Sequence, residues 1–63
     1  KAQDMKNVYL IFTNPNDVYS NDTVICDKEE LDSVLIEAGW IDPGTTMADY
    51  SWVVFENGNM IQG

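Results

Sequence analysis

The lone cysteine, Cys26, is the side chain best placed for reaction chemistry. It directly precedes an acidic segment, Asp27-Lys28-Glu29-Glu30, and a thiol beside a helix N-terminus can become an activated nucleophile. However, the chain has no histidine to act as a base and no second cysteine to form a redox pair or a disulfide. Neighbouring acids also favour the neutral thiol. We therefore interpret Cys26 as a small, buried packing residue.

Carboxylates are the second kind of side chain here with a known use in catalysis. Asp27 with Glu30, and Glu29 with Asp32, are three residues apart, and paired acids of this kind serve in acid–base catalysis. The same spacing is also typical of a helix cap and of a solvent-exposed helix face, which we favour. Without histidine, arginine or a glycine-rich phosphate loop, the sequence predicts no catalytic residue and no cofactor, so we expect the chain not to be an enzyme.

A polar loop could in principle supply oxygen ligands to Ca²⁺. Its candidate ligands are Asn14, Asn16, Asp17, Asn21 and Asp22. They do not follow the EF-hand spacing, and such side chains commonly bond the backbone of their own turn. A histidine-free chain with one cysteine also lacks the ligands of a zinc site. We predict a plain loop and no metal site.

The charge of the chain narrows its possible partners. Eleven acidic residues against three lysines give a net charge of −8. This surface would repel the phosphates of nucleic acid and an anionic membrane leaflet, and would attract a basic protein. No apolar run approaches the ~18 residues of a membrane span, and the first seven residues lack the apolar stretch of a signal peptide. We expect a cytoplasmic protein, and we interpret Lys1 as either a processed end or a cloning remnant.

Length limits the stability of the fold. A chain of 63 residues suffices for one domain, residues 1–63, whose core contributes only ~3–5 kcal/mol. Self-association is one way in which so small a core can be stabilised.

Two strands are expected in the first half of the chain. Residues 8–13 are β-branched, aromatic or aliphatic, and apolar on both faces, which is typical of a central strand. Residues 23–26 form a shorter second strand. The loop 14–22, which contains Pro15, is too short for a parallel crossover, so the pair should be antiparallel.

Residues 28–38 have strong signals for a helix. Asp27 and Glu30 have the spacing of a capping box, and Cys26 and Leu31 that of a hydrophobic staple. Gly39 should end the helix in the left-handed conformation. Trp40 beyond it is expected to fold back onto the preceding turn in a Schellman ending.

The helix should have one buried and one exposed face. A stripe for the core is formed by Leu31, Val34, Leu35 and Ala38. The opposite face carries an isoleucine among acids, an arrangement that resembles an apolar anchor within a charged rim. We predict this face as the binding surface, made of Glu29, Asp32, Ile36 and Glu37.

The second half should hold a turn and a hairpin. Asp42-Pro43-Gly44-Thr45 has the composition of a type II turn. Residues 52–61 contain Asn57-Gly58 between two apolar runs, which predicts a type I′ hairpin. Its register would place Glu56 opposite Asn59, Phe55 opposite Met60, and Val54 opposite Ile61.

These elements predict an α+β fold of order ββαββ, a small antiparallel sheet with one helix packed on one face. Both faces of the strands are apolar, so either the loop 39–50 or a partner should cover the second face. We expect a non-enzymatic acidic protein-interaction module, for instance an inhibitor-type domain that docks on a basic, nucleic-acid-binding protein surface. The alternative is a structural or accessory domain that self-associates as a homo-oligomer without another partner.

Overall fold

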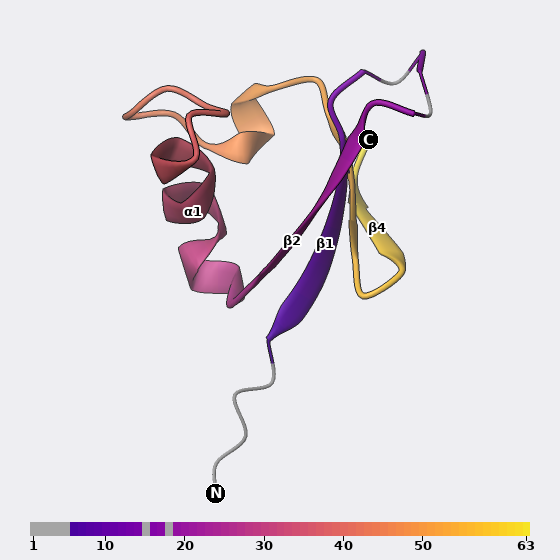
Figure 1. Cartoon of the computed structure of the whole chain (residues 1–63), viewed down its shortest axis with the longest axis horizontal. Helices are drawn as coiled ribbons and strands as arrows, with labels where there is room; N and C mark the ends of the chain where they lie inside the picture. Colours follow the sequence, from indigo (N-terminus) through magenta and orange to yellow (C-terminus); the bar gives the residue numbers. More distant parts are fainter. Residues whose placement is uncertain (1–5, 15, 18) are drawn as a thin grey trace, which may run out of the picture.

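A four-stranded antiparallel sheet with one helical segment makes up the fold (Figure 1). The computed structural model describes residues 6–14, 16–17 and 19–63, so Lys1 and Pro15, on which two predictions bear, lie outside the described residues. The strands are β1 (Asn7–Phe12), β2 (Asn21–Cys26), β3 (Val53–Glu56) and β4 (Asn59–Gln62). They lie in the order β2-β1-β3-β4. The predicted ββαββ architecture is confirmed.

Strand β1 is central, as its two-sided apolar pattern predicted. It pairs with β2 on one edge and β3 on the other, both antiparallel. β2 begins at Asn21, two residues before the predicted start, because Asp22 and Asn21 continue the ladder opposite Ile11 and Phe12. The low strand propensity of Asn and Asp conceals this extension in the sequence.

The helical segment begins differently from the prediction. Its first turn is a 3₁₀-helix, Lys28–Glu30, and α1 follows from Leu31–Glu37. The amide of Glu30 donates to the backbone oxygen of Asp27 at 3.0 Å, and the Asp27 side chain makes no cap hydrogen bond. The predicted capping box is therefore wrong, because a backbone bond of the tight first turn takes the amide that the carboxylate would have bound. The Asp27 carboxylate lies 3.5 Å from Lys6 Nζ instead.

The end of the helix agrees with the prediction. Gly39 has φ of +83°, its amide donates to the Ile36 oxygen at 3.0 Å, and the Trp40 amide donates to the Leu35 oxygen at 2.9 Å. These two bonds are the Schellman pattern. Ala38, predicted to face the core, is exposed because the helix ends at this residue.

The segment after the helix contains two tight turns. Thr45 N donates to the Asp42 oxygen at 3.1 Å, and Gly44 has φ of +87°, as a type II turn requires. A short 3₁₀-helix follows, η2 (Met47–Asp49). Thr46 N donates to Asp49 Oδ2 at 2.9 Å and the Asp49 amide donates to the Thr46 backbone oxygen at 2.9 Å, an arrangement that the sequence reasoning did not identify.

The β3–β4 hairpin has the predicted turn and a different register at its open end. Asn57 and Gly58 have φ of 51° and 89°. Glu56 faces Asn59 and Phe55 faces Met60, as predicted, but a β-bulge then places Gln62 opposite Val54. The predicted pairing of Val54 with Ile61 is wrong because Ile61 is the extra residue of the bulge.

The core lies between the sheet and the helix layer. It consists of Tyr9, Ile11, Cys26, Leu31, Leu35, Ile41, Met47 and Val54. Ile41 and Met47 come from the segment after the helix, which therefore packs on the same side of the sheet as α1 (Figure 1). The possibility that the loop 39–50 covers the second sheet face is thus excluded.

Candidate functional site: the open sheet face

Within the four strands, the sheet face opposite the helix carries no charged side chain. Residues directly opposite each other in antiparallel strands share a face, so Val8, Ile25, Phe55 and Met60 all lie on this side. The complete set, which we call the open face, is Val8, Leu10, Phe12, Asn21, Thr23, Ile25, Val53, Phe55 and Met60. It spans all four strands.

The open face has a hollow and, on its two edge strands, exposed apolar side chains. Six residues line a hollow of about 420 Å³: Val8, Leu10, Phe12, Thr23, Phe55 and Gly58. The rings of Phe12 and Phe55 meet edge to face, with centroids 6.0 Å apart. On the edge strands, Ile25 is 63% exposed and Met60 60% exposed. An apolar surface of this extent is typical of a protein contact site.

The acidic side chains lie away from the open face. Those near the helix include Glu29, Glu30 and Glu37, all exposed. Asp22 is opposite Ile11 and Glu56 is opposite Tyr9, so both belong to the helix side of the sheet. Among the described residues, charge is therefore confined to the helix layer, the loops and the covered side of the sheet.

The structure places the four predicted binding residues on the helical segment, and their role in binding stays a prediction, but Ile36 does not have the predicted exposure. Glu29 and Glu37 are exposed, whereas Ile36 is half-buried and packs against the core. Asp32 Oδ1 accepts a hydrogen bond from Met47 N at 2.9 Å. The expectation that Ile36 lies on an exposed helix face is wrong. The helix packs against the segment 40–50 as well as against the sheet.

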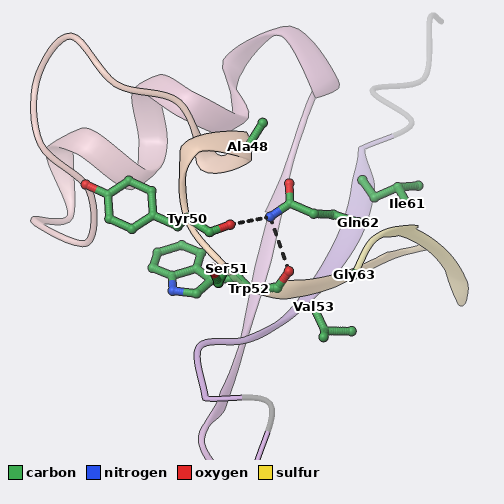
Figure 2. A pocket seen from close by; sticks show the side chains of 8 residues that line it. All are labelled: Ala48, Tyr50, Ser51, Trp52, Val53, Ile61, Gln62 and Gly63. Carbon is green, nitrogen blue, oxygen red and sulfur yellow. Dashed lines mark hydrogen bonds between the residues drawn. The ribbon is translucent and has the colours of Figure 1, made fainter.

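A second hollow, of about 590 Å³, lies beside the open end of the hairpin (Figure 2). Its walls include Tyr50 and Trp52, whose ring centroids are 5.0 Å apart, and Ile61. Gln62 Nε2 donates to the oxygens of Met47, Tyr50 and Trp52 at 3.1–3.2 Å. No side chain of Asp, Glu, Lys, Arg or His lines it, and its lining suits an apolar group.

Two buried titratable groups lie within the core. The Tyr9 hydroxyl donates to Glu56 Oε2 at 2.7 Å and accepts from Asn7 Nδ2 at 3.1 Å. Burial, together with the bond to Glu56, raises the pKa of Tyr9. Burial and the nearby carboxylates of Glu30 and Asp27 raise the pKa of the Cys26 thiol. A raised pKa disfavours the thiolate, which supports the interpretation of Cys26 as a packing residue.

The oxygen-rich loop bonds its own backbone. Asn14 Oδ1 accepts from Asn16 N at 3.0 Å, and Asp17 accepts from Tyr19 N at 3.0 Å and from Ser20 Oγ at 2.9 Å. Across residues 6–14, 16–17 and 19–63, no three His, Cys, Asp or Glu side chains gather as a metal site would require. In the same residues, every helix is too short or too polar to cross a bilayer.

Sequence reasoning recognised a surplus apolar face but assigned the binding site to the helix. The signal for the open face was the alternate apolar set Val8, Leu10 and Phe12, repeated by Val53 and Phe55. This pattern could not show which of the two sheet faces the segment 39–50 would cover. Comparison with protein-family models, curated proteins and solved structures gives no match to this chain.

Proposed function

We propose that this chain is a non-enzymatic protein-interaction module that binds through the open face, and that its partner presents an uncharged, apolar protein surface. The observation that supports this most directly is the segregation of charge. In a chain of net charge −8, nine adjoining positions over four strands carry no charge. Covering such a face removes apolar area from water, which is favourable.

Other kinds of ligand fit this face less well. Single-stranded nucleic acid needs cations beside the aromatic rings for its phosphates, and the open face has none among its nine residues. A small molecule is usually enclosed in a deep pocket with a few polar groups that fix its orientation. The hollow on this face is broad, and of its lining side chains only Thr23 carries a polar group. An apolar protein surface is the better match.

A second candidate function is the binding of a basic protein. It is favoured by the acidic side chains of the helical segment. The only ion pair among the described residues joins Lys6 to Asp27, so Glu29 and Glu37 remain available to a basic protein. Such docking would use the acidic helix surface and would weaken with salt. We place both candidates in the cytoplasm, and the single, unpaired Cys26 supports a reducing compartment.

Site-specific photo-crosslinking tests the proposal. Benzoylphenylalanine is introduced at position 25, on the open face, and separately at position 37, on the helix, and each chain is irradiated in an extract of its source cells. Ile25 is 63% exposed and Glu37 is exposed, so neither change should disturb the core. We expect protein adducts from position 25, and their loss when Met60→Lys is added on the same face.

The two positions give distinguishable results. Adducts from position 37 that disappear at high salt would support the basic partner instead. If position 25 gives no protein adduct, or if its adducts persist with Met60→Lys, the open face is not a binding surface and the proposed function is incorrect.

A further inference from the structure

We propose that the β2 edge, the side of Asn21–Cys26 that faces away from β1, binds an extended basic segment of a partner as a fifth strand of the sheet. This surface consists of backbone groups at the margin of the sheet. It is therefore separate from the open face and does not depend on the function proposed for that face. The outward backbone groups, the regular geometry and the charge of the β2 edge support strand addition.

The pairing with β1 determines which backbone groups of β2 point outward. Thr13 N donates to the Ser20 oxygen at 3.1 Å, and the pairing of β1 with β2 continues from this contact in the same register. In an antiparallel ladder, hydrogen-bonded pairs alternate with pairs that are not hydrogen-bonded. The backbone of Val24 therefore bonds β1, whereas the amides and oxygens of Thr23 and Ile25 point away from it.

The contacts on the other side of β1 agree with this alternation. Val8 is opposite Ile25, and its backbone groups bond Asn57 instead, with N to Oδ1 at 2.9 Å and Asn57 N to the Val8 oxygen at 2.8 Å. Across residues 6–14, 16–17 and 19–63, no strand other than β1 pairs with β2, and no hydrogen bond ends at the backbone of Thr23 or Ile25. The amides and oxygens of these two residues are therefore open to the backbone of an extended peptide.

The two outer edges of the sheet differ in how far they resist another strand. β4 has only four residues, and a β-bulge interrupts its pairing beside Val54. Short strands and bulges hinder the addition of a further strand, as do lysine and proline. β2 has six residues, contains neither lysine nor proline, and pairs with β1 without a shift of register. The β2 edge is therefore the one to which a strand can add.

The charge of the β2 edge indicates which kind of strand it accepts. Asp22 is exposed, and β2 contains no basic residue. Opposite charges on facing residues of neighbouring strands are stabilising and like charges are destabilising. A lysine or arginine of the partner is thus favoured opposite Asp22. A second copy fits less well, because it would bring together two chains of net charge −8 and supply no cation from its own β2.

A defined peptide tests this inference. The probe is acetyl-Lys-Val-Lys-Val-Lys-Val-Lys-amide, which can place its lysines on the side of Asp22 and its valines on the side of Thr23 and Ile25. It is titrated to about 1 mM into the isotope-labelled full chain and followed by NMR, a range that detects weak complexes. We expect saturable shifts centred on the amides of Thr23 and Ile25, and hydrogen exchange of both amides slowed at least roughly tenfold.

Methylated peptides separate strand addition from simple charge attraction. Methylating the valine nitrogens removes the amides that would face β2, and should weaken binding at least roughly tenfold. Methylating the lysine nitrogens removes the amides that face away, and should change binding by less than about threefold. Both peptides keep every positive charge of the probe, so attraction to an acidic chain alone would treat them equally.

Two substitutions at Thr23 give the matched comparison on the protein. Thr23→Pro removes an outward amide but no bond to β1, and an edge strand tolerates proline where the amide faces solvent. Thr23→Val also loses the hydroxyl but keeps the amide. Binding should weaken at least roughly tenfold for Thr23→Pro and stay within about twofold for Thr23→Val. Circular dichroism checks the fold, and if Thr23→Pro is unfolded, the methylated peptides on the parent chain decide.

Several results would overturn the proposal. These are no binding of the probe at about 1 mM, equal binding of the two methylated peptides, or equal binding by the two Thr23 variants when both are folded. Slow exchange of the Thr23 and Ile25 amides that increases with chain concentration, without peptide, would assign the β2 edge to a second copy instead. Met60→Gln, on a strand that β1 and β3 separate from β2, should bind the probe as the parent does. Its failure to bind would place the peptide on the open face.

Discussion

At the residue scale, the Tyr9 side chain brings a polar group into the core. It is fully buried, yet its hydroxyl reaches Glu56 on the neighbouring strand, where the two residues are directly opposite. A buried hydroxyl without a partner would destabilise the fold. The bonds to Glu56 and Asn7 satisfy the hydroxyl, and the bond to Glu56 ties β1 to β3 on the helix side of the sheet.

The raised pKa of Tyr9 predicts how stability changes at alkaline pH. The ordinary value is 10.0, and the folded state holds the phenol proton more tightly than the unfolded state does. The stabilisation is therefore complete below about pH 10 and is lost as the pH rises through the folded value. Tyr9→Phe should unfold more easily than the parent at about pH 7, by ~1 kcal/mol, and should lose less stability between about pH 10 and pH 11.5.

Urea denaturation across this pH range measures both effects. Tyr19→Phe is the matched control, because its side chain is 89% exposed and makes no core contact. The control should follow the parent throughout. Equal slopes for Tyr9→Phe and the parent above pH 10 would show that the Tyr9 proton does not stabilise the fold.

At the element scale, the hairpin turn is joined to the central strand by one residue. The Asn57 amide donates to the Val8 oxygen at 2.8 Å, and its Oδ1 accepts from Val8 N at 2.9 Å. Its Nδ2 donates to Asn7 Oδ1 at 3.0 Å. Asn57 therefore has two functions, since it supplies a positive φ to the turn and ties the turn to the start of β1.

Two substitutions separate these functions. Asn57→Gly keeps the favoured backbone conformation and loses only the side-chain bonds, for a cost of ~1 kcal/mol. Asn57→Ala loses the same bonds but keeps a β-carbon in the left-handed region, without the polar side chain that lets asparagine tolerate it, so it should be about 1 kcal/mol less stable than Asn57→Gly. Urea denaturation should rank the parent above Asn57→Gly and Asn57→Gly above Asn57→Ala. The exposed Asn59→Ala is the control, and a glycine variant as stable as the parent would show that the side-chain ties contribute nothing.

Elements set by a few neighbouring residues could be predicted from the sequence. Gly39, Pro43-Gly44 and Asn57-Gly58 each act through a local backbone preference, and the turns and the helix end appear where predicted. The bulge at Ile61 was not predictable in this way. It accompanies the bonds from Gln62 to carbonyls ten to fifteen residues earlier in the chain, and such contacts leave no local pattern.

The difference between local preferences and long-range contacts also explains why the exposure of Ile36 was predicted wrongly. Helical periodicity correctly placed Leu31 and Leu35 in the core. It treated the sheet as the only neighbour of the helix, and so it assigned Ile36 to the solvent. The contact of Asp32 with Met47 shows that the segment 40–50 also lies against the helix. The position of a loop without strong propensities is a tertiary property, and this decides which surface stays open.

At the scale of the whole molecule, the fold separates its charge from its apolar surface. The helix layer, the loops and the covered side of the sheet hold the exposed acids, and the open face holds three of the large exposed apolar side chains, Val8, Ile25 and Met60. Within the acidic part, repulsion among carboxylates opposes folding. The surface pair of Lys6 and Asp27, at 3.5 Å with both side chains over 40% exposed, offsets little of it.

Salt should therefore stabilise the monomer. Raising NaCl from about 10 mM to about 150 mM shortens the Debye length from ~30 Å to ~8 Å, which screens the acids from one another. At a chain concentration low enough to keep the protein monomeric, the free energy of unfolding should rise over this range. Lys28→Gln, which makes the net charge one unit more negative, should increase the dependence on salt.

Glu37 is the acid whose removal should help most. It is exposed and lies at the last residue of α1, where the helix dipole disfavours a negative charge in addition to the general repulsion. Glu37→Gln should raise the free energy of unfolding by ~0.3–0.5 kcal/mol at low salt, and the gain should shrink at about 150 mM NaCl. Glu29 is equally exposed but lies in the first turn of the helical segment, where a negative charge is favoured, so Glu29→Gln should give a smaller gain or a loss. Equal effects of the two substitutions would mean that only net charge matters, and no gain from Glu37→Gln at low salt would mean that the acidic layer does not oppose folding.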